Sequence, residues 1–252
     1  MERHLYIAAV MIMSACFALA GPLRASESIS LGGPSIEGVF AADGVGPYWD
    51  FFTDVTRASP LKVDIRLLPI KRYTRSLFSR EVDCLYMASD DEIFYTDHGA
   101  HVSQFLVSPS FNRINLHAFT LKSRPLIRDM AGLEGKAIVG DDSLHASTIA
   151  LRRLPFLTKI HYAPTVDDTF ELAMAGRAQV VISYMIDAEE YFARAGQPAF
   201  HADPSFILLS LGERFTCWPS DKAERFIAYV SERIDLLRER DELKQKYGFS
   251  MP

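Results

Sequence analysis

Hydrophobic and polar positions in this chain follow a strand-like alternation in some stretches and a helical period in others. Residues 62–68 (KVDIRLL) alternate before Pro69, which predicts a strand that ends at a breaker. Helical spacing follows directly, at Ile70, Tyr73, Leu77 and Phe78. A short apolar run over residues 82–87 predicts the next strand. The pattern therefore indicates a strand–helix–strand unit.

The same rhythm returns in the second half of the chain. Strands are expected over residues 137–140, 159–162 and 180–183, and helices over residues 143–154 and 165–175. The last of these helices has clear ends, because Thr165 and Asp168 form a start that resembles a capping box and Gly176 stands at the C-terminus. Two α/β lobes are therefore expected.

Residues 111–123 separate these two blocks and alternate as an extended segment, which predicts a crossing or hinge strand. Near the end of the chain, Ser220 can cap a helix with one apolar face, formed by Phe226, Ile227, Val230, Ile234 and Leu237. Ligands of open α/β sheets bind beyond the carboxyl ends of strands. A cleft between the lobes would thus be lined by strand-to-helix turns.

The first residues read as a targeting segment. Arg3 and His4 precede an apolar run over residues 5–20, and small residues follow it, as in a secretory signal peptide. The run is shorter than the roughly 20 apolar residues that a membrane-spanning helix needs. We expect cleavage after Ala20 or Ala25 and a periplasmic location. Lipidation of Cys16 is not expected, because the apolar run continues beyond it.

Composition narrows the function classes. A net charge of -5, with basic residues scattered among acids, argues against nucleic-acid binding. Loss of Cys16 with the leader leaves Cys84 and Cys217, which either pair in an oxidising compartment or remain as two buried thiols. The sequence has no Cys-x-x-Cys, and neither cysteine has a histidine at metal-ligand spacing. We expect no metal, no cofactor and a monomer.

The order of short motifs along the chain carries a family resemblance. The motifs are Leu67, Pro69, Lys71 and Arg72, then residues 81–83 (EVD), 133–140 (LEGKAIVG), 165–170 (TVDDTF) and 175–181 (AGRAQVV). Together they resemble the extracellular solute-binding proteins of family 3, the substrate-binding proteins of ABC transporters. The resemblance implies an α/β, two-lobed type II periplasmic-binding-protein fold with two hinge-crossing strands, and a membrane transporter as partner.

The resemblance also places the lobes along the sequence. We expect a signal peptide over residues 1–25, a first lobe over 26–113, a hinge crossing over 114–122, a second lobe over 123–212, and a return segment with C-terminal helices over 213–252.

The chain departs from the amino-acid binders of that family at two positions. Their carboxylate-gripping arginine has no counterpart in residues 89–101, and Tyr184 stands where their ammonium-gripping aspartate would be. Their Gly-Ser/Thr turn is replaced by residues 141–145 (DDSLH). Ordinary α-amino acids are therefore not the expected ligands.

Nine residues are candidates for contact with a ligand: Tyr48, Trp49, Lys71, Arg72, Ser89, Asp90, Ser143, His145 and Tyr184. Arg72 and Lys71 would anchor a ligand from the first lobe, Tyr48 or Trp49 would form an apolar wall, and Ser143 with Tyr184 would donate hydrogen bonds. This set suits a small organic acid or a polar aromatic solute.

Each candidate also has a plain structural explanation. Arg72 reads equally as a surface charge of a helix, the two aromatic residues as core side chains, and Ser143 as a helix N-cap. Lone histidines such as His145 are more often structural than functional.

The expected function is capture of a small polar solute for a membrane permease. The alternatives are a ligand-sensing module for a membrane receptor and a periplasmic enzyme that resembles dehydratases on the same fold. Acids near Asp90 and the histidines could supply acid–base groups, but the sequence contains no catalytic motif. We therefore expect binding without chemistry.

Overall fold

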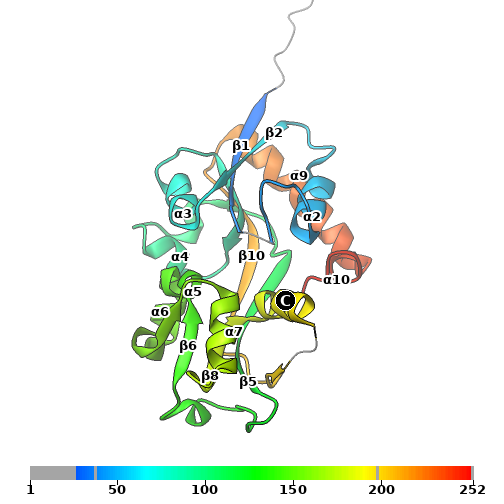
Figure 1. Ribbon diagram of the computed structural model, residues 1–252. Coiled ribbons are helices and arrows are strands. Elements are labelled where there is room, and N and C mark those ends of the chain that lie inside the picture. Colours follow the sequence, from blue (N-terminus) through cyan, green and yellow to red (C-terminus); the bar gives the residue numbers. More distant parts are fainter. Residues whose placement is uncertain (1–26, 37–38, 197–198, 251–252) are drawn as a thin grey trace, which may run out of the picture.

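The computed structural model describes residues 27–36, 39–196 and 199–250 (Figure 1). The signal peptide predicted over residues 1–25 lies outside these residues. The first half of the chain alternates strands and helices: β1 (Ser28–Pro34), α2 (Pro47–Thr56), β2 (Lys62–Leu68), α3 (Ile70–Phe78), β3 (Cys84–Ser89) and α4 (Ile93–Thr96). The strand–helix–strand unit read from the hydrophobic pattern is present, with its second strand beginning at Cys84.

The second half repeats the alternation after two strands that leave the first. Its elements are β4 (Leu106–Val107), β5 (Asn112–Leu121), β6 (Ile138–Asp141), α5 (Asp142–Ala146), α6 (Thr148–Arg153), β7 (His161–Ala163), α7 (Val166–Met174), β8 (Val180–Tyr184) and α8 (Met185–Ala195). Short 3₁₀ turns span Val102–Gln104, Ala131–Leu133 and Pro155–Lys159. The chain ends with β9 (Phe200–His201), β10 (Leu209–Cys217), α9 (Asp221–Glu239) and α10 (Glu242–Tyr247).

One expected helix is divided. Residues 143–154 form α5 and α6 because Ser147 takes an extended conformation between them (φ -82, ψ 98). Its hydroxyl then accepts a hydrogen bond from the backbone N–H of Ala150 at 3.3 Å, which caps α6. The short element β7 is likewise displaced toward the C-terminus, since the 3₁₀ turn occupies the residues before it.

The strands form a continuous sheet in the order β2-β1-β3-β10-β5-β8-β6-β7. Pairing is parallel among β1, β2 and β3, and again among β6, β7 and β8. Between these halves, β10 runs antiparallel to β3 and β5, and β5 runs antiparallel to β8. Two lobes, each with three parallel strands, are thus joined through β5 and β10 (Figure 1).

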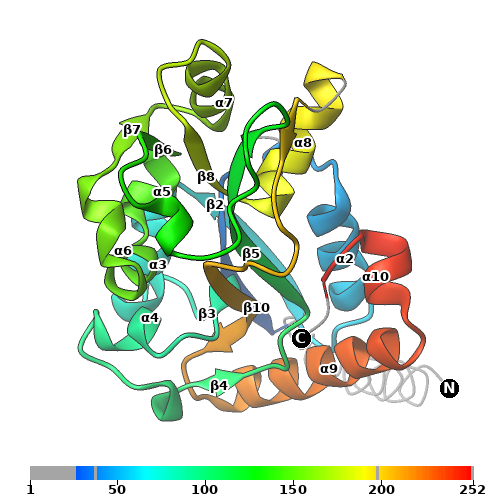
Figure 2. The same ribbon diagram turned by 90° about the horizontal axis from the view of Figure 1, so that it is seen from below.

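The C-terminal helices return to the first lobe. Figure 2 shows α9 and α10 beside α2, and Phe226, Val230 and Ile234 of α9 belong to the same buried core cluster as Phe51 of α2. The apolar face predicted for this helix therefore covers the first lobe. No helix among the described residues is both long and apolar enough to span a membrane.

A disulfide joins β3 to β10. Cys84 and Cys217 lie opposite each other in the antiparallel register, and both are completely buried. Their sequence separation is 133 residues. The bond therefore fastens the first lobe to the crossing strand that returns from the second, and it settles the choice between paired and free thiols.

We predict that replacing both cysteines by serine lowers the free energy of unfolding by about 2–4 kcal/mol, because the open chain regains conformational entropy. Guanidinium unfolding measures the loss, and the reduced wild-type protein serves as the matched control, since it should unfold with the variant. Two titratable thiols in the denatured, unreduced wild-type protein would contradict the pairing.

Candidate ligand-binding site between the lobes

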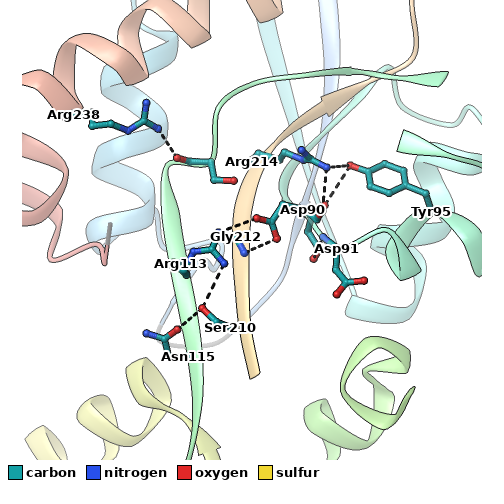
Figure 3. A network of polar contacts seen from close by, with 11 residues as sticks. Asp90, Asp91, Tyr95, Arg113, Asn115, Ser210, Gly212, Arg214 and Arg238 are labelled. Atoms are coloured by element: carbon teal, nitrogen blue, oxygen red, sulfur yellow. Dashed lines mark hydrogen bonds and ion pairs between the residues drawn. The ribbon is translucent and has the colours of Figure 1, made fainter. Parts of the chain in front are cut away.

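The first polar group at the lobe junction is Asp90, directly after β3. Its carboxylate accepts hydrogen bonds from the backbone N–H of Gly212 at 2.7 Å and from the guanidinium of Arg113 at 3.2 Å (Figure 3). Beside it, Arg214 donates to the hydroxyl of Tyr95 at 3.0 Å. Asp90 is thus held against both crossing strands, and each nearby arginine has at least one acceptor, although the buried Nε of Arg214 has none among the described residues.

A second polar cluster is buried where α2 meets the crossing strands. The Tyr48 hydroxyl donates to Glu213 Oε2 at 2.5 Å, and Asn112 Nδ2 donates to the same oxygen at 2.8 Å. Only 6% of Glu213 is exposed. Burial raises the pKa of the Glu213 carboxyl to about 7, although the Tyr48 and Asn112 hydrogen bonds oppose the rise.

The second lobe adds further acids beside this cluster. Asp141 ends β6 and accepts from the backbone N–H groups of Ser143 at 2.7 Å and Leu144 at 3.2 Å, so it caps α5. Asp187 lies in the first turn of α8. Burial raises its pKa to about 7, and the negative charges of Asp141, Glu190 and Glu213 add to the rise.

The charges that act on Asp187 are therefore all negative. No basic side chain of the described residues contributes to the pKa of either Asp187 or Glu213. An unpaired buried carboxylate is costly, so each of these groups is stabilised either by a proton or by a cation. The region around Asp187, where α8 packs against β5 and β8 and the charges of Asp141 and Glu213 act, has the chemistry to receive a positively charged group.

The candidate ligand-binding residues of the first lobe differ in how far they are buried. Tyr48 is buried, as described above. Trp49 stacks on Phe40 at 4.3 Å between ring centroids and donates to the carbonyl of Ala41 at 2.6 Å. The Arg72 side chain is 65% exposed and pairs with Glu81 at 3.4 Å, beyond the C-terminus of α3.

The remaining candidates lie at the strand ends that the sequence indicated. The Ser89 hydroxyl accepts from the backbone N–H of Asp91 at 3.1 Å, and Ser143 is exposed and donates to Asp141. Tyr184 ends β8, and burial raises the pKa of its phenol despite a hydrogen bond with Ser147. The side chains of Lys71 and His145 lie outside the part of the chain that the structure describes.

The structure therefore gathers Tyr48, Asp90 and Tyr184 around the crossing strands and leaves Arg72 at the surface. It adds groups that the sequence pattern did not single out: Asn112, Arg113, Asp187, Glu213 and Arg214. The signal for Glu213 was present in β10 (LSLGERFTC), where two charged residues interrupt an otherwise buried strand. Among the described residues, no cluster of three or more potential metal ligands occurs.

Two ion pairs connect α6 of the second lobe to acidic residues of the first lobe. Arg153 donates to both carboxylate oxygens of Asp91, at 3.0 and 3.2 Å, and Arg152 pairs with Asp97 at 2.5 Å. The adjacent Ile149 is 8% exposed and packs into a core cluster of the first lobe. The arrangement is therefore a closed one, with α6 of the second lobe docked beside α4 of the first.

Comparisons with known proteins identify the fold. No family model matches the chain, and its sequence matches none of the curated proteins. A histidine kinase sensor domain similar to periplasmic binding proteins aligns with a TM-score of 0.67 at 17% identity over 91% of this chain and 100% of that chain. A putative L-cystine ABC transporter protein of Listeria monocytogenes aligns with a TM-score of 0.63 at 15% identity, over 89% of this chain and 98% of that one.

A third similar structure is an arginine-, lysine- and histidine-binding protein of Geobacillus stearothermophilus, with a TM-score of 0.62 at 15% identity over 90% of this chain and 97% of that one. These structures confirm the two-lobed periplasmic-binding-protein fold that the sequence resemblance implied. They are binding and sensor proteins.

We predict that stability falls as pH rises from about 4 to about 7. In this window the folded protein keeps protons on Glu213 and Asp187, whose pKa values are both raised to about 7, whereas the unfolded carboxyls, with ordinary values of 4.5 and 3.8, have lost them. Ionisation of Glu213 alone, in the unfolded chain, lowers the free energy of unfolding by up to about 3 kcal/mol across this window, at about 1.36 kcal/mol per pH unit. Urea unfolding at several pH values measures the slope.

Glu213→Gln should flatten this dependence, because an amide keeps an acceptor for Tyr48 and cannot ionise. Glu239→Gln, an exposed acid near the end of α9, is the matched control and should keep the wild-type slope. Identical slopes in the two variants would contradict the assignment.

We also predict that Arg152→Gln with Arg153→Gln shifts the unliganded protein toward an open form, with a larger radius of gyration in X-ray scattering. The arginine side chains are 57% and 52% exposed, so high salt should have a similar effect through screening. Arg72→Gln with Arg225→Gln removes two ion pairs within the first lobe and is the charge-matched control. Unchanged scattering in the first variant would show that other contacts hold the lobes together.

Proposed function

We propose that this chain is a periplasmic solute-binding protein of the family 3 type, which holds a small polar solute between its lobes and presents it to a membrane transporter. The fold, the two crossing strands and the apolar leader support this proposal. Binding without chemical transformation agrees with the binding and sensor proteins that share the fold.

The ligand in this proposal carries a cationic group and no carboxylate that needs an arginine. The observation that carries this step is the pair of acids Asp187, which is partly buried, and Glu213, which is buried; neither makes an ion pair with a basic side chain among the described residues. Arg113, in contrast, is paired with Asp90, and Arg214 donates to the Tyr95 hydroxyl, although the buried Nε of Arg214 has no hydrogen-bond partner among the described residues. Amines, guanidines and polyamines therefore fit this site better than the organic acids suggested by Arg72 and Lys71.

A role as a sensing module is the second candidate. It is favoured by the likeness to a histidine kinase sensor domain, which extends over 91% of this chain and the whole of that domain. The nature of the neighbouring genes separates the two roles: a permease and an ATPase indicate transport, and a histidine kinase indicates sensing.

A thermal-shift screen tests the ligand class, because a ligand that binds only the folded state raises the melting temperature. We predict that amines and guanidines raise it, and that α-amino acids, organic acids and sugars do so weakly or not at all. Asp187→Asn should weaken amine binding about tenfold to a hundredfold, as expected for loss of a charge-assisted hydrogen bond.

Glu189→Gln, an exposed acid on the same helix, is the matched control and should bind amines as the wild-type protein does. Tight binding of an organic acid, or amine binding that persists unchanged in Asp187→Asn, would overturn the assignment of the site.

A further inference from the structure

A cavity of about 830 Å³ opens on the second lobe, away from the crossing strands. It lies at the amino ends of β6 and β7, near Ile138 and His161, whereas Asp141 of the interlobe site lies at the carboxyl end of β6. Its apolar lining comes from several separate segments: Met130, Leu133, Ile138, Phe156, Ile160 and Leu172. The cavity is thus a second concave surface, distinct from the interlobe site.

Three cations border this cavity, and none of them has a charged or hydrogen-bonding partner among the described residues. Lys136 precedes β6, Lys159 ends a 3₁₀ turn, and Arg177 follows α7; all three are exposed. Within the described ranges, none of their charged groups makes a hydrogen bond or ion pair, although Arg152 and Arg153 of the same lobe are both paired. One acid, Glu134, shares the border, so the cavity keeps an excess of positive charge.

Local backbone geometry brings two of these cations together. Lys136 follows Gly135, and Arg177 follows Gly176; both glycines have positive φ, 68° and 73°. Residues with a Cβ adopt this conformation only at a cost, so the two tight turns favour glycine. The backbone N–H of Gln179 then donates to the carbonyl of Ala137 at 2.7 Å, which joins the two turns at one end of the lobe.

We propose that this cavity binds a small amphipathic organic anion, with its apolar body against Phe156 and Leu133 and its anionic head at Lys136, Lys159 and Arg177. The volume lies within the roughly 300–1,000 Å³ of small-molecule sites. An apolar floor with a cationic border complements both halves of such a ligand, since burial of its chain removes apolar surface from water and its head pairs with free cations. The proposal is independent of the interlobe ligand.

Isothermal titration calorimetry with decanoate tests the proposal, with acetate as the head alone and 1-decanol as the neutral chain. Decanoate should bind most tightly of the three. The triple variant Lys136→Gln, Lys159→Gln, Arg177→Gln should weaken decanoate binding at least about tenfold, because it removes the charge-assisted contacts. The triple variant Arg66→Gln, Arg75→Gln, Lys244→Gln removes three exposed cations from the first lobe and should bind normally.

Methionine-methyl NMR locates the bound decanoate. The signal of Met130, which is 47% exposed at the cavity, should shift, and that of Met185, at the start of α8 near the interlobe site, should not. Met130→Glu provides a second variant that should repel decanoate without removing a buried side chain.

Several results would overturn the proposal. One is a shift of Met185 in place of Met130, and another is equal decanoate binding by the two triple variants. A concentration-dependent dimer that the cavity triple variant abolishes would assign the surface to a second copy of the chain. Flotation with phosphatidylglycerol vesicles, without any heat from monomeric decanoate, would assign it to a membrane surface.

Discussion

The antiparallel pairing of β5 with β10 is the constraint on which the two-lobed arrangement depends. One part of β10 pairs with β3 of the first lobe and the other part with β5, which in turn pairs with β8 of the second lobe. Gly212 lies at this junction, where an added Cβ would stand 2.2 Å from Asp90 Oδ2. The absence of a side chain therefore lets Asp90 bond to the backbone of β10, and the Cys84–Cys217 bond secures the same strand a few residues further on.

Much of the fold was predictable, because the strands and helices of both lobes are long enough to show their own periods. The alternation over residues 111–123 clearly predicted the strand β5. The strand β10 was not predicted, because Gly212, Glu213 and Arg214 interrupt its apolar pattern. Residues 209–217 form a strand because they pair with β3 and β5 in the folded protein. The break at Ser147 was also hidden, because a serine within a helical pattern does not reveal that its hydroxyl will cap the following turn.

The position of the candidate site could be predicted from the sequence better than the chemical groups that form it. The local hydrophobic pattern alone predicts the ends of strands, and Asp90, Ser143 and Tyr184 lie at or just after these ends. The environment of Glu213 depends instead on Tyr48, 165 residues away in the sequence, and on Asn112, 101 residues away. Burial of a carboxyl without a basic neighbour is a property of the assembled lobes, which no local period encodes. For the same reason Arg72 looked suitable as an anchor, and only the fold shows that its side chain pairs with Glu81.

Closure and ligand charge are linked through these carboxyls. The pairs Arg153–Asp91 and Arg152–Asp97 join the two lobes directly, and as partly exposed ion pairs they contribute modestly to the closed arrangement. Asp187 is acted on by the negative charge of Asp141 in the same lobe and by that of Glu213 on the crossing strand β10, and both raise the free energy of its ionised form. A proton relieves this repulsion when no ligand is present, and a bound cation would relieve it in the same way. Proton and cation therefore compete for the same acids, so a cationic ligand that binds near neutral pH must release protons as the lobes close.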